Sequence, residues 1–467
     1  MPCTVAIVGA GPAGLVTAAA ALEAGLVPTV FEAAEEIGGV WRPGSGQAWP
    51  GLRLNLSRYT CCFSSVPWPR DAPDFPGQPD LAAYLRRFAE SHGVLGHIRF
   101  GQRVSSLAEL DRFGGVVIAT GIFAQPAVPA LPGRFGGVSL PATAYRGPAA
   151  LHGHRVIVVG LAFSGAEIAA ELAAAGVEVT VVAARGMWLL SRYACGDAGA
   201  ALPWDLLAYR RSARERNLAL PAEQANRLRG RRYEESGANP AILHPRLRLD
   251  PNSGQPPHVV FADRLVAQAR AGRLAVVPGR AVRLTAGGVR LDTGEDIRGD
   301  AVIWCTGYRP DLSLLAPAQR TALAYDPGDQ IQPLPLHLGT FHPGLPGVAF
   351  VGMYRGPYFA VMELQARWAC AVFARQLAPP APAELRTGVA TALAIRAQRP
   401  RPQFPYADYV GHADAIAARL GVRPALEQLW DDPVVSAHYR LTGRHARPEV
   451  AWAQIASVRE RMREAAA

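Results

Sequence analysis

Two stretches of the chain share one order of hydrophobic and polar positions. In residues 5–33, the β-branched run 5–8 leads through a glycine turn and an Ala/Leu-rich segment to a second apolar run. Residues 154–185 repeat this order, with a glycine turn at residues 160–165. A short β-branched run before a longer Ala/Leu-rich segment is typical of a buried strand followed by a helix packed closely on a sheet. The pattern therefore predicts two strand–turn–helix–strand units.

Three further apolar runs read as buried strands. Residues 115–119 and 300–305 are each followed by a Thr-Gly pair, at Thr120 and Thr306, and these small exits suit close approach to a dinucleotide. Residues 347–352 precede a helix that would return the chain to the first unit. An amphipathic helix is expected over residues 79–92, and hairpin turns at two glycine-bearing segments, 286–288 and 292–294.

The pattern is weaker in four other segments. We expect a loop-rich connector over residues 131–145 and an irregular, Arg-rich insertion over residues 205–250. Residues 379–405, rich in Pro and Ala, read as a linker, and the remainder to residue 467 reads as a largely helical appendage.

Each glycine of the first turn has a mechanical role in a dinucleotide site. Gly9 allows the tight turn, Gly11 lets a pyrophosphate approach the backbone, and Gly14 lets the helix meet the strand. Glu32 ends the unit, where a carboxylate accepts hydrogen bonds from a ribose 2′-hydroxyl and repels an additional phosphate. This unit is expected to bind a dinucleotide without a 2′-phosphate.

The second turn differs from the first in an informative way. Gly160 and Gly165 keep the outer positions, Ser164 lies within the turn, and Ala162 adds a methyl group where the pyrophosphate approaches. The unit ends in Arg185, and an arginine near the ribose accommodates a 2′-phosphate, which favours NADP over NAD.

Two units of opposite ribose preference predict an α/β fold with two Rossmann-like dinucleotide-binding domains. FAD on the first and NADPH on the second is the simplest assignment, with the second domain inserted in the first. The expected limits are 1–148 for the first part of the FAD-binding domain, 149–312 for the NADP-binding domain with an insertion over about 193–250, 313–380 for the return segment, and 381–467 for a helical C-terminal extension.

Composition narrows the possible partners. The chain has 467 residues, 49% of them hydrophobic and 18% charged, and its net charge of +10 comes from arginine alone because it contains no lysine. Arginine suits phosphate, but the arginines are scattered except near residues 210–216 and 227–232, which argues against a nucleic-acid or membrane surface. Solvated surface is the simpler reading of these two patches, and an anionic substrate is the alternative.

Targeting and cysteine patterns favour a reducing compartment. No apolar run reaches the ~20 residues that a membrane span needs, and no basic segment precedes the first apolar run. The six cysteines show neither CxxC nor Cys/His metal spacing, so we expect a cytoplasmic protein without a metal site. Adjacent Cys61 and Cys62 read as buried small hydrophobes rather than a redox pair.

Two segments after the first unit carry candidate chemistry. Gly39 and Trp41, in the run Ile-Gly-Gly-Val-Trp, fit a loop passing close to a flat ring system, or equally a glycine turn with a packing tryptophan. Asn55 stands in an apolar stretch where its amide needs a partner, and a flavin edge or a bound oxygen species is one such partner. The chain shows no Ser/His/Asp arrangement, so the reaction would be that of the cofactors.

These residues resemble the class B flavin-containing monooxygenase family over nearly the whole chain. The matching motifs are GAGPAG at 9–14, GGVW at 38–41, LNLSR around Asn55, the two Thr-Gly exits, MELQARW at 362–368 and YRLTG at 439–443. The last two resemble heteroatom-oxidising members more than the longer Baeyer-Villiger enzymes. Within MELQARW, Gln365 is expected to contact FAD.

The resemblance implies a reaction and an active-site residue. In the family, NADPH reduces the flavin, O₂ forms a C4a-hydroperoxyflavin, and retained NADP⁺ shields it until a nitrogen or sulfur atom of a small substrate takes the distal oxygen. Asn55 matches the family asparagine that hydrogen-bonds the nicotinamide and the flavin–oxygen adduct. Substrate contacts are expected from residues 193–250 and 354–361, and the C-terminal region could form a homodimer contact or a cover.

One departure affects pyridine-nucleotide handling. The family fingerprint FxGxxxHxxxY maps onto Phe135, Gly137 and Tyr145, but Pro141 stands in the histidine position. Together with Ala162, this predicts altered coupling between NADPH binding and flavin reduction.

The alternatives are a Baeyer-Villiger oxygenase, a flavin-dependent halogenase, a disulfide or other NAD(P)H reductase, and a non-enzymatic flavoprotein sensor. Product analysis would separate the first two from an N- or S-oxygenase, the reductase would need a cysteine pair near the flavin, and the absence of NADPH-driven flavin bleaching would favour the sensor.

Overall fold

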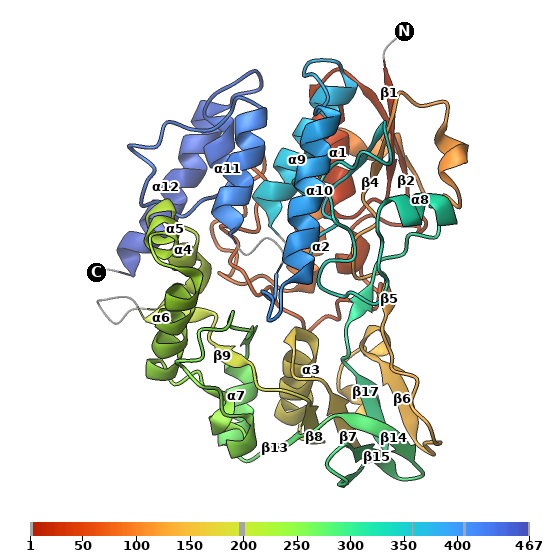
Figure 1. Ribbon diagram of the computed structural model, residues 1–467, viewed down its shortest axis with the longest axis vertical. Coiled ribbons are helices and arrows are strands. Elements are labelled where there is room, and N and C mark those ends of the chain that lie inside the picture. The colour runs from red at the N-terminus through yellow and green to blue at the C-terminus, as the bar shows by residue number, and fades with distance from the viewer. Residues whose placement is uncertain (1–2, 196–200, 357, 405–407, 466–467) are drawn as a thin grey trace.

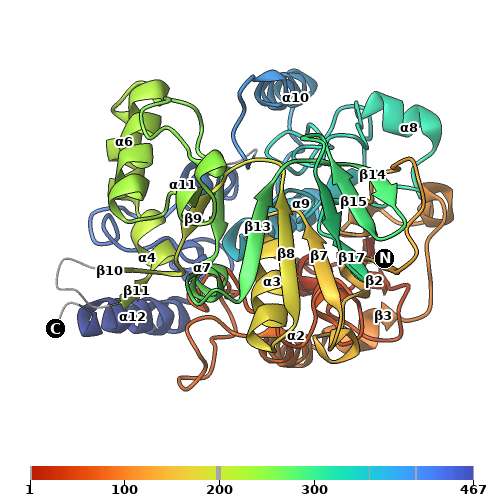
Figure 2. The same cartoon turned by 90° about the horizontal axis from the view of Figure 1, so that it is seen from below.

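Two five-stranded parallel sheets frame the molecule in a computed structural model that describes residues 3–195, 201–356, 358–404 and 408–465 (Figures 1 and 2). The first sheet has the order β19-β4-β1-β2-β3 and the second the order β13-β8-β7-β17-β6. Their strands are β1 (Thr4–Val8), β2 (Val27–Phe31), β3 (Ile98–Arg99), β4 (Gly115–Ile118), β6 (Val138–Pro141), β7 (Arg155–Val159), β8 (Glu178–Ala183), β13 (Leu274–Pro278), β17 (Ala301–Trp304) and β19 (Val348–Phe350). The two expected Rossmann-like units and the α/β fold class are thereby confirmed.

Helices and short strands outside the two main sheets complete the fold. The helices are α1 (Pro12–Glu23), α2 (Gln78–Ser91), α3 (Phe163–Ala174), α4 (Trp204–Ala208), α5 (Arg211–Leu218), α6 (Ala222–Glu235), α7 (Asp263–Arg270), α8 (Pro317–Ala322), α9 (Phe359–Phe373), α10 (Pro382–Ala397), α11 (Tyr409–Arg419) and α12 (Pro448–Glu464). The remaining strands are β5 (Gln125–Pro126), β9 (Trp188–Leu190), β10 (Tyr193–Cys195), β11 (Ala201–Pro203), β12 (Val259–Phe261), β14 (Ala281–Thr285), β15 (Gly288–Leu291), β16 (Asp296–Arg298) and β18 (Tyr308–Arg309).

The first sheet is buried on both faces because its strands are apolar at nearly every position. Val5 and Ile7 of β1 belong to a core formed with α1, α2 and α9, whereas Ala6 and Val8 face a second core that includes Leu110. This alternation follows from the two-residue repeat of a strand.

The second sheet is covered differently on its two faces. Val156 and Val158 of β7 pack with α3 and α7, while Ile157 and Val159 pack against the antiparallel sheet β14-β15-β16. Both turns of that small sheet lie at the predicted glycine segments.

Residues 131–145 were expected to form a loop-rich connector, but the structure places the strand β6 within them. β6 pairs in parallel with β17, placing Pro141 opposite Trp304 at the edge of the second sheet. A proline is tolerated there because an edge strand has one row of amides without ladder partners. We propose that the second unit begins before Val138 rather than at residue 149.

Residues 205–250 are largely helical rather than irregular. The region carries α4, α5 and α6, and α6 is rich in Ala, Arg, Glu and Gln, all good helix formers. Its outer face is charged and includes the pair Arg227–Glu223, so the apolar repeat that reveals most helices is weak here.

The expected linker over residues 379–405 is wrong for most of its length. Residues Pro382–Ala397 form α10, and Pro382 stands at the first helical position, where its missing N–H removes no helix bond. Figures 1 and 2 show α10 at the surface of the molecule, in front of α9 in the view of Figure 1.

The C-terminal region is helical as expected, but it is part of the core rather than an appendage. Tyr409 and Ile416 of α11 and Tyr439 pack in the same core as β1 and α9. Arg440, 8% exposed, donates to Glu23 of α1 at 2.7 Å and to Glu363 of α9 at 3.0 Å.

Within the described ranges, every helix falls short of the length or apolar character that crossing a bilayer requires.

Candidate active site

A cleft of about 2110 Å³ lies where the carboxyl ends of the two sheets meet. Its walls include residues that lie one or two positions after strands of both sheets, namely Gly9, Glu32, Thr120, Gly160, Arg185 and Thr306. Ligands of open α/β sheets bind at this edge. The volume is larger than the ~300–1,000 Å³ of an ordinary ligand pocket, so the cleft has room for more than one large ligand.

The first glycine turn has the geometry expected of a phosphate-binding loop. Gly9 adopts φ +106° and its N–H donates to the Phe31 carbonyl at 2.8 Å, while a Cβ atom on Gly14 would collide with the Gly9 carbonyl. Gly14 does not line the cleft, because its role is to let α1 pack on β1. The Glu32 carboxylate accepts from the Ala10 N–H at 2.7 Å, which holds it beside the turn.

The loop of Gly39 and Trp41 lies directly across from this turn. Gly39 has φ +56°, and a Cβ atom added to it would lie 2.9 Å from Gly11 Cα. Both glycines and Trp41 line the cleft, and the Trp41 carbonyl accepts from Gln78 Nε2 at 2.7 Å. The two backbones therefore form a narrow passage that side chains would fill.

The second glycine turn repeats the backbone geometry of the first. The Gly160 N–H donates to the Val182 carbonyl at 2.9 Å, φ of Gly160 is +115°, and a Cβ atom on Gly165 would collide with the Gly160 carbonyl. Ala162 precedes the first residue of α3 and lines the cleft, whereas Gly165 faces β7. The amino ends of α1 and α3 thus both face the cleft, an arrangement that favours anions.

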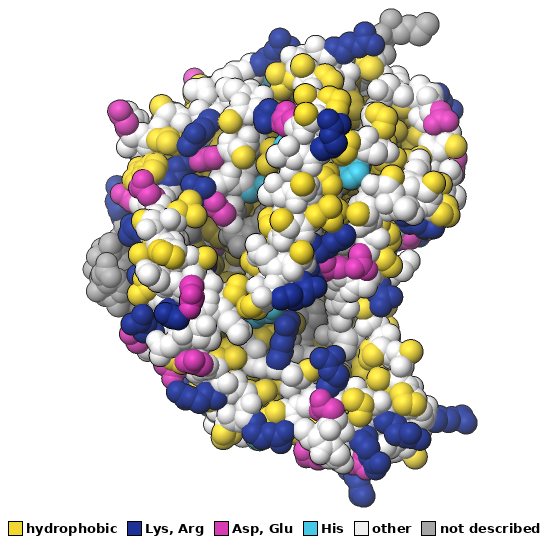
Figure 3. Space-filling model, in the orientation of Figure 1, with side chains coloured by type: hydrophobic (Ala, Val, Ile, Leu, Met, Phe, Trp, Pro, Cys, Tyr) yellow, Lys and Arg dark blue, Asp and Glu magenta, His cyan; other side chains and the backbone are white. Residues whose placement is uncertain are grey.

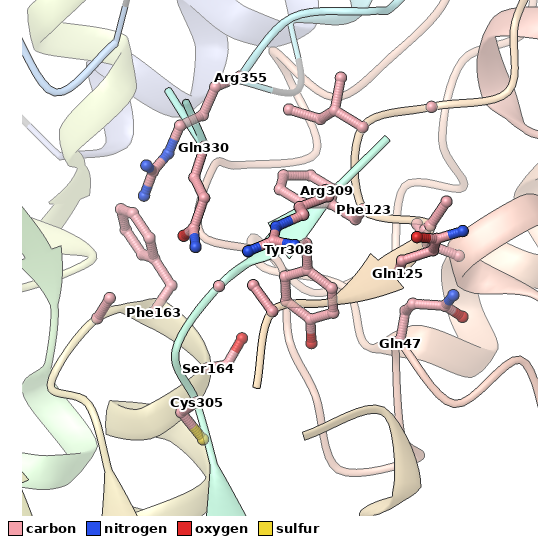
Figure 4. Close-up of a pocket in the computed structure, with 18 of the residues that line it drawn as sticks. Gln47, Phe123, Gln125, Phe163, Ser164, Cys305, Tyr308, Arg309, Gln330 and Arg355 are labelled. Carbon is pink, nitrogen blue, oxygen red and sulfur yellow. The ribbon is translucent and has the colours of Figure 1, made fainter. Parts of the chain in front are cut away.

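Tyr308 was not singled out from the sequence, and it lies beside this second turn. Its hydroxyl lies near the Ser164 side chain, and burial raises its pKa to about 12. β18, which contains it, pairs with β5, so Tyr308 lies on the strand pair that joins the two units (Figure 4). A tyrosine following a Thr-Gly strand exit is the signal that could have found it.

Asn55 lines the cleft and is held by an arginine that sequence reasoning missed. Arg192 Nη2 donates to Asn55 Oδ1 at 3.1 Å, and Arg192 Nε donates to the Leu54 carbonyl at 3.0 Å. The same guanidinium pairs with Glu167 of α3 at 2.7 Å and with Asp263 at 2.9 Å. Because Oδ1 is used by Arg192, the amide Nδ2 of Asn55 is left to donate toward the cleft.

The two Thr-Gly exits line the cleft, and Gln365 does not. Thr306 Oγ1 donates to the Ala127 carbonyl at 2.7 Å, and Thr120 lies beside Met353. Gln365 is fully buried: its amide accepts from the Gly352 N–H at 3.0 Å and donates to the Gly339 carbonyl. Gln365 holds the turn at Gly352, which does line the cleft, and its direct contact with FAD stays a prediction.

The fingerprint tyrosine ties the connector to the second unit, but Pro141 is remote from the cleft. Tyr145 donates to Glu171 of α3 at 3.2 Å, and Trp49 donates to the same carboxylate. Burial raises the pKa of Glu171. Pro141 is not among the cleft-lining residues, so any influence of this position on coupling would act through β6 and β17.

Both segments expected to contact substrate contribute to the cleft. The insertion supplies Trp204, Tyr209 and Tyr233, and the return segment supplies Tyr354 and Tyr358. Figure 3 shows arginine side chains gathered around the hollow near the middle of the molecule.

Cysteine and metal chemistry have little support in the described residues. Cys61 and Cys62 are buried and do not line the cleft, and burial raises the pKa of Cys62 to about 12. In the part of the chain that the structure describes, no three His, Cys, Asp or Glu side chains lie close enough to share a metal ion.

The donor set fits two dinucleotides. A Cβ atom on Gly11 would meet only the Gly39 backbone, at 3.5 Å or more, so this turn leaves an open cradle on the cleft side. One unit presents a carboxylate after its second strand and the other presents Arg185. These are the groups that suit a ribose 2′-hydroxyl and a 2′-phosphate, respectively.

Known proteins match the chain over most of its length. The profile of the family described as flavin-binding monooxygenase-like matches residues 3–114 and 107–442. The chain is 28% identical to dimethylaniline monooxygenase (N-oxide-forming) 2 of Rattus norvegicus, covering 94% of this chain and 88% of the relative.

Two solved structures share the fold. S-allyl-L-cysteine S-oxygenase from Allium sativum superposes with a TM-score of 0.62 at 19% identity, covering 99% of this chain and 94% of that one. OTEMO in complex with FAD and NADP gives a TM-score of 0.67 at 16% identity, covering 89% and 98%. With the family profile spanning most of the sequence, the resemblance is confirmed: this chain belongs to the flavin-binding monooxygenase-like family and is an NADPH-dependent flavin monooxygenase with FAD and NADPH as cofactors.

Proposed function

We propose that the protein oxygenates a nitrogen or sulfur atom of a small molecule. When bound, FAD would be reduced by NADPH. The reduced flavin would then react with O₂ to give a C4a-hydroperoxyflavin, whose distal oxygen would pass to the substrate. Relatives named as N-oxide-forming and as an S-oxygenase support this choice of atoms.

Each unit receives one cofactor in this proposal. The first turn would hold FAD, with Glu32 for its ribose and Trp41 and Thr120 for its ring system. The second turn would hold NADPH, with Arg185 for its 2′-phosphate. The first set is Gly9, Gly11, Gly14, Glu32, Gly39, Trp41 and Thr120, and the second is Gly160, Ser164, Gly165, Arg185 and Thr306.

The observation that carries the proposal is the fixed amide of Asn55. Its Oδ1 is engaged by Arg192, whose side chain is only 4% exposed, so Nδ2 presents a preorganised donor to the cleft. A donor held in advance stabilises developing negative charge on oxygen without the cost of reorganisation. A simple reductase would have no need of such a group.

Stopped-flow spectroscopy tests this function. FAD-loaded enzyme reduced by NADPH is mixed with O₂, and a long-lived peroxyflavin absorbance that NADP⁺ prolongs is expected, followed by an oxygenated amine or sulfide. Direct return to oxidised flavin without that absorbance, and without oxygenated product, would refute the proposal.

Product identity separates the other candidates. A ketone converted to an ester marks a Baeyer-Villiger oxygenase, and an aromatic substrate halogenated in the presence of halide marks a halogenase. A disulfide reductase is disfavoured because buried Cys61 and Cys62 lie outside the cleft. A sensor would show no flavin bleaching by NADPH.

Replacing Arg185 is expected to change cofactor preference. Arg185→Gln removes a charge-assisted contact of about 1.5–3 kcal/mol with the 2′-phosphate, so the Kd for NADPH in flavin reduction rises about ten- to a hundred-fold while that for NADH changes little. Rapid-mixing measurements of flavin bleaching at varied NADPH and NADH would give both constants. Equal losses for the two nucleotides would place the 2′-phosphate elsewhere.

A homodimer and a cytoplasmic location stay predictions. Light scattering on the FAD-loaded protein would decide the first.

A further inference from the structure

Two arginines from different units line the same cleft without a carboxylate partner in the described parts of the chain. Arg185 follows β8, and Arg355 lies in the loop after β19. Besides burial, the charges of Arg185 and Arg401 lower the pKa of Arg355, and the charge of Arg280 lowers the pKa of Arg185. Besides burial, the charges of Arg185, Arg355 and Arg401 all lower the pKa of His258. These three side chains therefore lie close to one another around His258.

Bringing these guanidinium groups together raises the free energy of the nucleotide-free protein. Burial, followed by the neighbouring charges of Arg185 and Arg401, lowers the pKa of Arg355 to about 10, and burial likewise lowers that of Arg185. Both guanidinium groups remain charged at neutral pH and repel each other. A buried cation is ordinarily paired, so an anion placed between the two would relieve the repulsion.

Residues 398–404 form a strap that fixes this place across the two units. Arg401 donates to Asp329 of the return segment at 2.7 Å, and the Gln403 amide bonds both backbone groups of Val259, at 2.8 and 2.9 Å. Asp329 is thereby occupied by Arg401 and is not a partner for Arg355.

The end of the strap also orients Arg355. Its guanidinium lies over the Phe404 ring, 5.8 Å from the centroid, and Phe404 packs against Phe163 at 6.3 Å. Figure 4 shows Arg355 extending toward Phe163, the first residue of α3. The cation from the first unit therefore reaches the nucleotide turn of the second.

We propose that Arg355 and Arg185 together bind the 2′-phosphate of NADPH, and that the strap of residues 398–404 holds Arg355 in place for it. The inference rests on the proposed cofactor placement, since Arg185 follows the second strand of its unit as Glu32 follows that of the first. A dianionic phosphate with three acceptor oxygens can accept from two guanidinium groups at once. The first unit would thus contribute directly to selecting NADPH over NADH.

Calorimetric titration of FAD-loaded enzyme with 2′,5′-ADP and with 5′-ADP tests this assignment. Wild-type enzyme is expected to prefer 2′,5′-ADP, and Arg355→Gln to weaken 2′,5′-ADP about ten- to a hundred-fold while leaving 5′-ADP within about two-fold. Arg355→Lys keeps the charge and is expected to retain part of the affinity. Arg283→Gln, an exposed arginine on β14 outside the cleft, is the matched control and should bind like wild type.

Thermal unfolding distinguishes a binding role from a structural one. Because Arg355 is repelled by its neighbours, Arg355→Gln is expected to leave the Tm of nucleotide-free enzyme unchanged or raised, and to reduce only the increase in Tm that 2′,5′-ADP produces. A lowered Tm of the nucleotide-free variant with unchanged affinity would show that Arg355 only packs on Phe404, and would overturn the proposal.

The remaining outcomes separate the two proposals. Wild-type preference for 2′,5′-ADP that survives in Arg355→Gln overturns the role of Arg355 alone. Equal weakening of both nucleotides places Arg355 on the 5′-phosphate, which the two probes share, and overturns the 2′ assignment. Binding as expected without oxygenated product from any amine or sulfide supports the phosphate site and refutes the proposed oxygenation.

Discussion

An Asn55→Ala enzyme is expected to bind FAD and oxidise NADPH but to release hydrogen peroxide in place of most oxygenated product. The substitution removes the donor that Arg192 holds toward the cleft, and loss of one such donor typically costs about 10²- to 10³-fold in rate. The measurement is the ratio of product formed to NADPH consumed, with hydrogen peroxide quantified in parallel.

Asn217→Ala is the matched control for this experiment. Asn217 is exposed on α5 and does not line the cleft, so its replacement should leave the product-to-NADPH ratio unchanged. If Asn55→Ala keeps the wild-type ratio as well, the amide has no part in oxygen transfer.

Replacing Arg192 by methionine is expected to reduce both stability and coupling. Arg192 is 4% exposed and its partner Glu167 is 2% exposed, so the variant leaves a buried carboxylate with only the partly exposed Arg264 as its ion-pair partner. Breaking a buried pair from one side costs about 3–5 kcal/mol of unfolding free energy. Denaturant unfolding of the FAD-loaded protein measures this loss, and the product ratio should fall because Asn55 is no longer oriented.

A double variant separates the two effects. Adding Glu167→Gln to Arg192→Met removes the uncompensated charge and should recover part of the stability, while the product ratio stays low. Strictly additive losses of stability would show that Arg192 and Glu167 do not act as a pair.

The two nucleotide turns could be predicted because their requirements are local. Gly9 and Gly160 need positive φ, and Gly14 and Gly165 leave no space for a Cβ atom, so residue type and spacing are dictated within six positions. Asn55 could be predicted because a lone amide in an apolar stretch needs a partner.

Arg192 could have been found by the same reasoning, but its contacts could not. It follows the apolar strand β9, where a charged residue is as conspicuous as Asn55. Its bond to Asn55 spans 137 residues, and it depends on how the second unit packs against the first, which no local pattern encodes. The same holds for Arg355 and its strap.

The mispredicted segments share a weak apolar repeat. α10 has Ala392 as its only buried residue, and half of the residues of α6 are charged, so the interpretation of these segments followed their Pro and Arg content. Gln365 shows what a motif match leaves open: its amide bonds the backbone at Gly352 and Gly339, and its contact with FAD stays a prediction.

The Arg440 contacts have a consequence for synthesis. Glu23 is synthesised early, but Arg440, whose guanidinium pairs with it, lies 417 residues later in the chain. Glu363 pairs with the same guanidinium. Since α11 and Tyr439 also belong to this hydrophobic core, the domain that is translated first is completed last. During synthesis, the core of the first unit therefore stays incomplete until the residues around Arg440 have been added, after the entire second nucleotide unit.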